Sequence, residues 1–156
     1  MPPQGASATR LRIPPPLIAL SCLAAAWIVQ RAAALPRIVS PPWSWAGILF
    51  VLAGLALTAW GAATFRHRAT TIDPFGVPSR LVQEGPFRRT RNPMYLGLTS
   101  ALLGVGLLAG TPAFLLVPVV FAVTIQLLFV PLEERKLARL FGEEYGGYRR
   151  RVRRWF

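Results

Sequence analysis

Four apolar segments, each about 20 residues long, dominate the sequence and leave few folds open to it. They cover residues 17–35, 45–65, 94–110 and 112–132. About 20 helical residues cover about 30 Å, which is the thickness of the hydrocarbon core of a bilayer. The segments therefore predict an all-α integral membrane protein with four transmembrane helices, the last two of which form a C-terminal helical hairpin.

The distribution of basic residues predicts how the chain is oriented. Of the 18 Lys and Arg residues, six lie between the second and third segments and eight follow the fourth. Only Arg31 and Arg37 lie near the connection between the first two segments, and the turn at Thr111 carries no charge. This alternation is typical of the positive-inside rule and predicts a bacterial-type inner membrane with both termini cytoplasmic. The net charge of +12 is then better explained by lipid head groups than by nucleic acid.

The residues outside these segments form an N-terminal stretch, a loop and a tail. Residues 1–16 are rich in proline and predict a disordered N-terminus, whereas residues 17–156 predict one membrane domain. That domain includes a cytoplasmic loop, 66–93, and a cytoplasmic, amphipathic tail, 133–156, whose helix breaks near Gly142. A cleaved signal peptide is the alternative interpretation of the first segment, although its apolar stretch is longer than such peptides have. With one cysteine and one histidine, the chain shows no metal-binding pattern.

The third and fourth segments fix the position of the candidate site. A two-residue connection forces two helices to run antiparallel, so their far ends meet at one membrane surface. The third segment is preceded by Arg88, Arg89 and Arg91, and the fourth is followed by Glu133 and Glu134. We therefore expect these cations and anions to be neighbours in space. Such a pair of opposite charges at a bilayer edge suits a zwitterionic ligand.

Helical spacing separates the two glutamates. Glu133 has Lys136 three residues later, whereas Glu134 has no basic residue on its own helix face. Glu134 should therefore find its cation across the hairpin, on Arg88 or Arg91, or on a bound ligand. On the third segment, Gly97, Ala101 and Gly104 share one helix face, which predicts close packing against another helix.

Two motifs carry a resemblance to a known family. They are GPFRRTRNPMYLG, residues 85–97, and EERKLARLFGEEYGGYRRRVRRWF, residues 133–156. Their order and spacing resemble the isoprenylcysteine carboxyl methyltransferases and their bacterial relatives, and more loosely the phospholipid N-methyltransferases. The resemblance implies that S-adenosylmethionine binds at the cytoplasmic end of the hairpin, beneath the C-terminal segment. Asn92 departs from the histidine of the protein-methylating members and matches the lipid-methylating ones, which puts a prenylcysteine substrate in doubt.

The resemblance and the residue chemistry together assign the site. The predicted catalytic residues are Arg91, Asn92, Tyr95 and Glu134. The predicted cofactor-binding residues are Arg88, Arg91, Pro93, Tyr95, Gly97, Glu133, Glu134, Tyr145 and Tyr148. A glutamate suits the ammonium group of S-adenosylmethionine, an arginine suits its carboxylate, and tyrosine rings suit its sulfonium.

The sequence thus predicts an S-adenosylmethionine-dependent membrane methyltransferase. Its acceptor would be lipophilic, with a carboxylate or amine on a prenyl or lipid-like molecule. Two alternatives remain at this stage, an NADPH-dependent sterol-type reductase and a non-catalytic membrane scaffold. The sequence specifies neither the acceptor nor the oligomeric state, and O-, N- and S-methylation all stay open.

Overall fold

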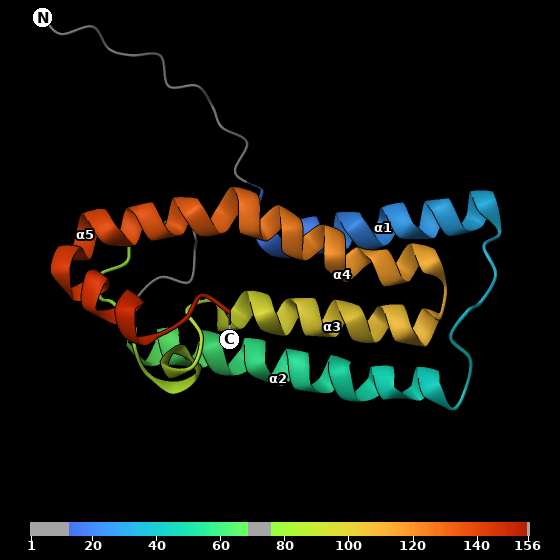
Figure 1. The fold of residues 1–156 in the computed structure, drawn as a ribbon, viewed down its shortest axis with the longest axis horizontal. Helices are drawn as coiled ribbons and strands as arrows, with labels where there is room; N and C mark the ends of the chain where they lie inside the picture. The colour runs from blue at the N-terminus through green and yellow to red at the C-terminus, as the bar shows by residue number, and fades with distance from the viewer. Residues whose placement is uncertain (1–12, 69–75, 156) are drawn as a thin grey trace, which may run out of the picture.

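The computed structural model describes residues 13–68 and 76–155, and every regular element in these ranges is helical (Figure 1). The elements are α1 (Pro15–Ala33), η1 (Trp43–Trp45), α2 (Ala46–His67), η2 (Gly85–Arg88), α3 (Pro93–Ala109), α4 (Pro112–Thr124), η3 (Ile125–Phe129) and α5 (Val130–Arg151). The elements η1 and η2 are 3-10 turns, and η3 is a π-helical segment that joins α4 to α5. The all-α prediction is confirmed for these residues.

Three helices are long and apolar enough to cross a membrane: Pro15–Ala33, Trp43–His67 and the continuous helix Pro112–Arg151. The remaining predicted span is α3, which is apolar but has only 17 residues. At 1.5 Å per residue it measures about 25 Å, at the short end for a transmembrane helix. Large apolar side chains such as Leu49 and Leu127 are exposed on the outside of the bundle, as lipid contact requires. The chain is therefore an integral membrane protein.

The first helix begins earlier than the sequence predicted. Residues 1–12, where we expected disorder, lie outside the described residues. The disorder prediction is wrong for Pro15 and Pro16, which form the first turn of α1. Proline is tolerated there because the N–H groups of a first helical turn have no partner within the helix.

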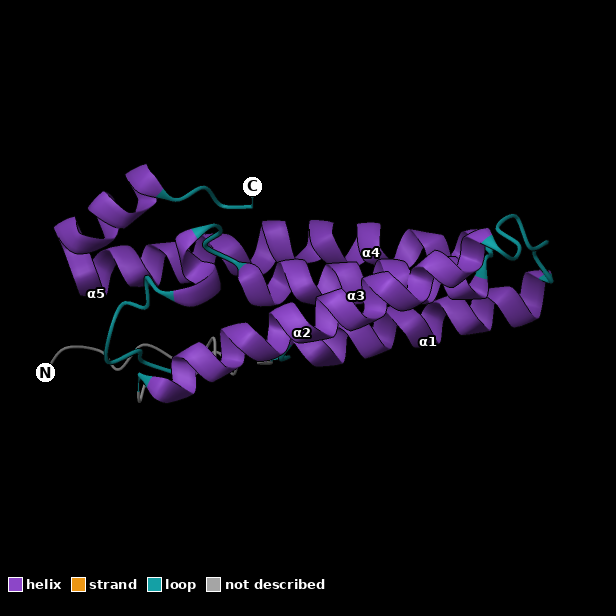
Figure 2. Cartoon of the chain, turned by 90° about the horizontal axis from the view of Figure 1, so that it is seen from below, coloured by secondary structure: helices purple, strands orange, loops and turns teal. Residues whose placement is uncertain are grey.

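Helix α3 lies between α2 and α4, and α1 packs along α4 (Figures 1 and 2). The contact between α2 and α3 is made by small residues. Gly47 lies against Gly104, and Gly54 lies against Gly97 and Ala101, so that a Cβ added at any of these glycines would overlap the opposite backbone. The predicted small-residue stripe on α3 is thus confirmed, and its partner is a matching glycine row on α2.

The helix that contains the fourth predicted span extends beyond Leu132, the expected end of that span. The helix continues past the two glutamates and changes direction at Gly142, whose φ of 45° and ψ of −118° are not helical. Glycine adopts a positive φ without a steric penalty, so the break expected at this residue is confirmed. Beyond it, the second half of α5 folds back toward the bundle (Figure 1). This reversal brings the C-terminal residues over the end of the hairpin.

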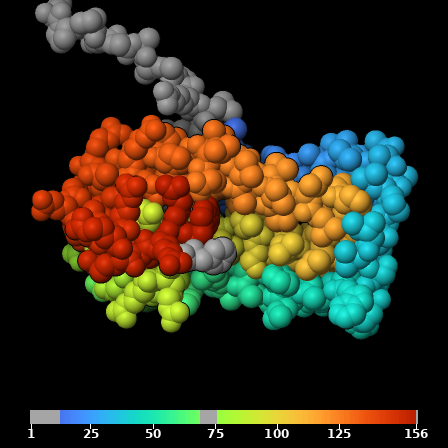
Figure 3. Space-filling view, in the orientation of Figure 1, coloured from blue at the N-terminus to red at the C-terminus, as the bar shows by residue number. Residues whose placement is uncertain are grey.

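The two ends of the bundle differ in their connections. At one end, called the turn end, residues 34–45 and the turn at 110–111 lie together. Gly110 accepts backbone hydrogen bonds from Ile38 (2.7 Å) and Val39 (3.0 Å). At the opposite end, called the site end, residues 76–92 meet residues 142–155 (Figure 3).

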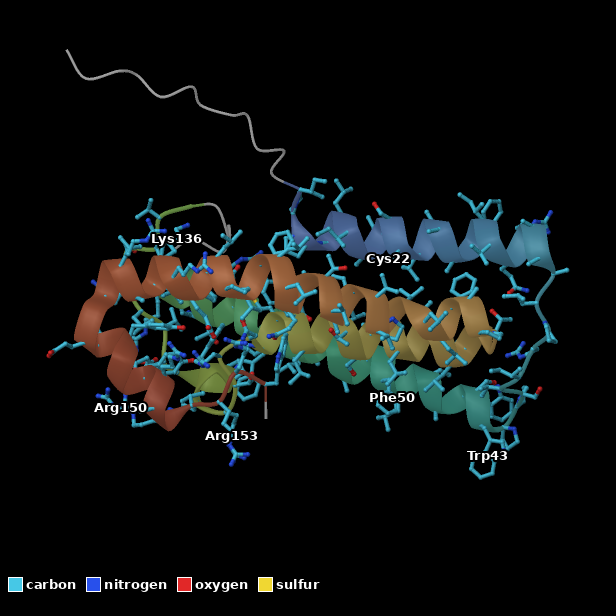
Figure 4. The ribbon with its side chains drawn as sticks, turned by 45° about the horizontal axis from the view of Figure 1, so that its top comes forward. Cys22, Trp43, Phe50, Lys136, Arg150 and Arg153 are labelled. Carbon is cyan, nitrogen blue, oxygen red and sulfur yellow. The ribbon has the colours of Figure 1, made fainter. Side chains whose placement is uncertain are left out.

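Aromatic side chains mark the turn end. Trp43 is 79% exposed and points away from the helices (Figure 4), and Trp45 is also exposed. Tryptophan is enriched where a membrane meets water, so these positions fit the interfacial belt expected at this connection.

Candidate functional site

The two charged clusters that the sequence predicted to meet do meet at the site end. Arg91 Nη1 lies 2.9 Å from Glu134 Oε1, across the hairpin. One turn into α3, the Tyr95 hydroxyl donates a 2.6 Å hydrogen bond to Glu133 Oε1. The two helices that carry these residues therefore run antiparallel, and Arg91 is the partner of Glu134 across the hairpin.

The Arg91–Glu134 pair is largely shielded from solvent. The two side chains are only 10% and 14% exposed. Arg91 Nη1 also donates to the Tyr145 hydroxyl at 3.1 Å. The Nε of Arg91 is buried and has no hydrogen-bond partner among the described residues. A buried N–H without a partner is unfavourable, so this atom is a candidate donor to a ligand.

The hydrogen-bond partner of Glu133 is Tyr95, and not Lys136 as its helical spacing suggested. The hydrogen bond that it accepts comes from Tyr95, whereas the Lys136 ammonium donates to the backbone oxygen of Gly76. The hydrogen bond from Tyr95 engages only Oε1 of the Glu133 carboxylate, whereas both oxygens of Glu134 accept hydrogen bonds from Arg154. Glu133 therefore keeps acceptor capacity that Glu134 has largely used.

The C-terminal residues 152–155, called the strap, lie beside the start of α3. The backbone N–H of Arg91 donates to the carbonyl of Arg153 at 3.0 Å. The Thr90 hydroxyl donates to the carbonyl of Arg154 at 2.9 Å. Two segments more than sixty residues apart in sequence are thus fastened together by the backbone of the strap.

Arg154 of the strap is a site residue that the sequence analysis missed. Its Nε donates to Glu134 Oε1 at 2.9 Å and its Nη2 donates to Glu134 Oε2 at 2.7 Å. This bidentate bond raises the pKa of Arg154. Next to it, Trp155 Nε1 donates to Gln126 Oε1 at 2.8 Å, which anchors the strap on η3.

The side chain of Asn92 contacts the backbone of the strap. Its side-chain amide donates to the carbonyl of Arg154 at 3.0 Å, and the residue is buried. It occupies the N-cap position of α3, as expected, but its side chain caps no helical N–H. This contact uses one of the two N–H donors of the amide, and a catalytic role for Asn92 stays a prediction. Pro93 follows as the first residue of the helix.

A cavity of about 480 Å³ opens beside these groups, and its walls are mostly apolar. They include the first turn of α1, Thr58 and Phe65 of α2, and Leu137 of α5. Eight of the predicted site residues also line it: Arg91, Asn92, Pro93, Tyr95, Glu133, Glu134, Tyr145 and Tyr148. Tyr148 is fixed there by a 2.8 Å hydrogen bond from its hydroxyl to the carbonyl of Phe87.

Two predicted cofactor-binding residues are absent from the cavity wall. Arg88 lies in the turn η2 with its side chain exposed, because that turn directs it outward while Arg91 enters the site. Gly97 is buried against Thr58 and Gly54 of α2, so it serves helix packing. The structure therefore places neither residue at the cavity. No cluster of three or more His, Cys, Asp or Glu side chains that could hold a metal is found within residues 13–68 and 76–155.

Comparison with known proteins identifies the family. The model of the phospholipid methyltransferase family matches residues 43–144, about two-thirds of the chain. The match includes Arg91, Tyr95 and both glutamates, and it stops before Tyr145 and the strap. A search of curated proteins finds no match. The chain therefore belongs to the phospholipid methyltransferase family, the family of membrane methyltransferases that are like isoprenylcysteine carboxyl methyltransferase.

Proposed function

We propose that this membrane methyltransferase transfers a methyl group from S-adenosylmethionine to a lipophilic acceptor. The observation that carries the proposal is the shielded Arg91–Glu134 ion pair in the wall of the 480 Å³ cavity. Small-molecule pockets measure roughly 300–1,000 Å³, are mostly apolar, and contain a few placed polar groups. An ion pair on an apolar wall suits a ligand that has both a charged amino-acid group and a larger body.

The residues of the site fit this cofactor. The unpartnered Nε of Arg91 is a suitable donor to the α-carboxylate, because a guanidinium binds carboxylates through charge-assisted hydrogen bonds. For the α-ammonium, the free acceptor capacity favours Glu133 over Glu134, which is already engaged by two guanidinium groups. Tyr145 and Tyr148 line the cavity, and aromatic rings attract a sulfonium through cation–π interaction.

The contribution of the protein to the reaction is to position the reactants and exclude water. S-adenosylmethionine supplies an activated methyl group when it is bound. Holding the acceptor in line with that methyl group converts an encounter in solution into a reaction within one site. The apolar walls at Phe65, Leu98 and Leu137 exclude water, which favours a displacement in which charge is neutralised. A carboxylate acceptor needs no catalytic base, and we assign none.

The setting of the cavity supports a lipid-like acceptor. Its apolar walls come from α1, α2 and α3, and both α1 and α2 also expose large apolar side chains on the outside of the bundle. We propose a carboxylate or an amine on a prenyl or lipid-like molecule as the methyl acceptor. Exposed arginines such as Arg66, Arg89 and Arg150 are abundant at the site end, which by the positive-inside rule favours a cytoplasmic site and cytoplasmic termini in a bacterial-type inner membrane.

Calorimetric titration of the detergent-solubilised protein tests this function. We expect S-adenosylmethionine to bind and NADPH not to bind. Binding of NADPH alone would support a sterol-type reductase, and binding of neither would support a non-catalytic scaffold. A radiolabelled methyl donor incubated with the protein and a total lipid extract, followed by identification of the labelled product, then names the acceptor.

A further inference from the structure

The strap brings a second arginine to Glu134, and this arginine lies outside the region that the family model matches. Arg91 contacts Oε1 of Glu134, whereas Arg154 donates to both carboxylate oxygens. One carboxylate is thus shared by two guanidinium groups, and the three side chains together carry one net positive charge. The bidentate bond fixes the plane of the Glu134 carboxylate, which a single contact from Arg91 would not do.

We propose that Arg154 is a positioning residue that sets the orientation of Glu134, and through it that of Arg91, for cofactor binding. The inference rests on the proposed function, in which Arg91 binds the cofactor carboxylate. Arg154 itself is 32% exposed and does not line the cavity, so it acts through Glu134. It also leaves the carboxylate of Glu134 occupied, so that Glu133 is the residue that binds the ammonium.

The way in which the strap is built supports this role. The carbonyl of Arg154 accepts hydrogen bonds from both the Thr90 hydroxyl and the Asn92 amide, one on each side of Arg91. The side chain and the carbonyl of Arg154 are therefore both tied to the residues around the ion pair. A free C-terminal arginine that touched Glu134 by chance would not have its backbone held in this way.

Arg153 offers a matched control. It precedes Arg154 in the strap, carries the same charge, and its side chain is exposed and points away from the protein (Figure 4). Its contacts with Thr90 and Arg91 are made by the backbone, so Arg153→Ala retains them. Comparison of Arg154→Ala with Arg153→Ala thus separates the side-chain contact from the loss of one positive charge.

The test measures binding of S-adenosylmethionine to the full-length protein in detergent. We expect Arg154→Ala to bind about tenfold more weakly and Arg153→Ala to bind like the wild type. Millimolar guanidinium should restore most of the affinity of Arg154→Ala, because the position of Arg154 is open to solvent. The double variant Glu134→Gln/Arg154→Ala should bind no more weakly than Glu134→Gln alone, because both changes remove one coupled unit.

The results that would overturn the inference are distinct from failure of the proposed function. Wild-type affinity in Arg154→Ala, equal losses in both arginine variants, or a loss that guanidinium does not rescue would each overturn the positioning role alone. If Arg154→Ala does not fold, Arg154→Lys retains the charge without the bidentate geometry, and wild-type affinity in that variant would also overturn it. A wild-type protein that does not bind S-adenosylmethionine would overturn the proposed function and this inference together.

Discussion

Arginine side chains lie beside both ends of α3, but their hydrogen-bond partners differ between the two ends. At the turn end, Arg37 donates from Nη2 to the carbonyl of Leu108 (2.8 Å) and from Nε to the carbonyl of Val39 (2.9 Å). At the site end, Arg91 and Arg154 share the carboxylate of Glu134. The partners are neutral backbone atoms at one end and an ionised side chain at the other.

The difference separates an arginine that stabilises the fold from one that we propose to bind a ligand. Arg37 is exposed and its bonds close the connection over the α3–α4 turn, where the carbonyls at a helix C-terminus lack helical partners. Arg91 is shielded and keeps an N–H without a partner among the described residues. The cluster of Arg91, Arg154 and Glu134 at the site end therefore has a net positive charge. The Nε of Arg91 adds a hydrogen-bond donor without a partner in a mostly apolar cavity wall. Both features favour binding of an anionic group.

The two ends of the bundle should lie on opposite sides of the membrane, and this predicts the largest experimental difference between them. In a Cys22→Ser background, Ser40→Cys at the turn end should react fully with a membrane-impermeant maleimide added to intact cells. Ser79→Cys at the site end should react only after the cells are permeabilised. The expectation follows from the excess of basic residues at the site end. Labelling of position 79 in intact cells would reverse the orientation and with it the compartment of the site.

Removal of Arg91 should abolish most cofactor binding. Arg91→Ala removes both the ion pair with Glu134 and the donor proposed for the carboxylate, so we expect S-adenosylmethionine to bind about a hundredfold more weakly. Arg91→Lys keeps the charge but loses the guanidinium geometry, and we expect about a tenfold loss. Calorimetric titration measures both. Equal affinities for Arg91→Lys and the wild type would show that only charge matters at this position.

Glu133→Gln should have a smaller effect than Arg91→Ala. It keeps an acceptor for the Tyr95 hydroxyl but removes the negative charge proposed to bind the ammonium. We expect S-adenosylmethionine to bind about tenfold more weakly, the effect of losing one charge-assisted hydrogen bond. A Tyr95→Phe variant, which leaves the charge in place, is the matched control in the same titration. A larger loss in Tyr95→Phe than in Glu133→Gln would contradict this assignment.

The smallest expected effect is at the turn end. Arg37→Ala removes two hydrogen bonds to backbone carbonyls, which should lower the stability by about 1 kcal/mol. Affinity for S-adenosylmethionine should not change. Thermal unfolding in detergent measures the first quantity and titration the second. Weaker binding of S-adenosylmethionine to Arg37→Ala would show that the turn end influences the site, and it would contradict the purely structural role assigned to Arg37.

The parts of the molecule that the sequence predicted are those with a regular spacing. The two-residue turn dictated an antiparallel hairpin, so the contact of Arg91 with Glu134 could be expected before the structure was known. The stripe containing Gly97 and Gly104 indicated a close helix contact, and α2 supplies it. Gly142 indicated the break in the last helix because glycine is a poor helix former.

The strap could not be predicted in this way. Residues 152–155 are not helical, and three of the hydrogen bonds that hold them are accepted by backbone carbonyls, which every residue type has. Arg154 is one of eight basic residues after the fourth apolar segment, and nothing in its spacing distinguishes it from Arg153. The position of Arg88 could not be predicted for the same reason. The turn η2 directs its side chain away from the site, and that turn depends on the fold and not on a helical period.

The most direct test of the central claim, that the cluster around Glu134 binds the cofactor, is titration of Glu134→Gln with S-adenosylmethionine. The variant keeps the size of the side chain but removes the charge that holds Arg91 and Arg154. A loss of about 1.5–3 kcal/mol corresponds to roughly ten- to a hundredfold weaker binding. Glu143→Gln, on the exposed part of α5, should bind like the wild type. Wild-type affinity in Glu134→Gln would contradict the account.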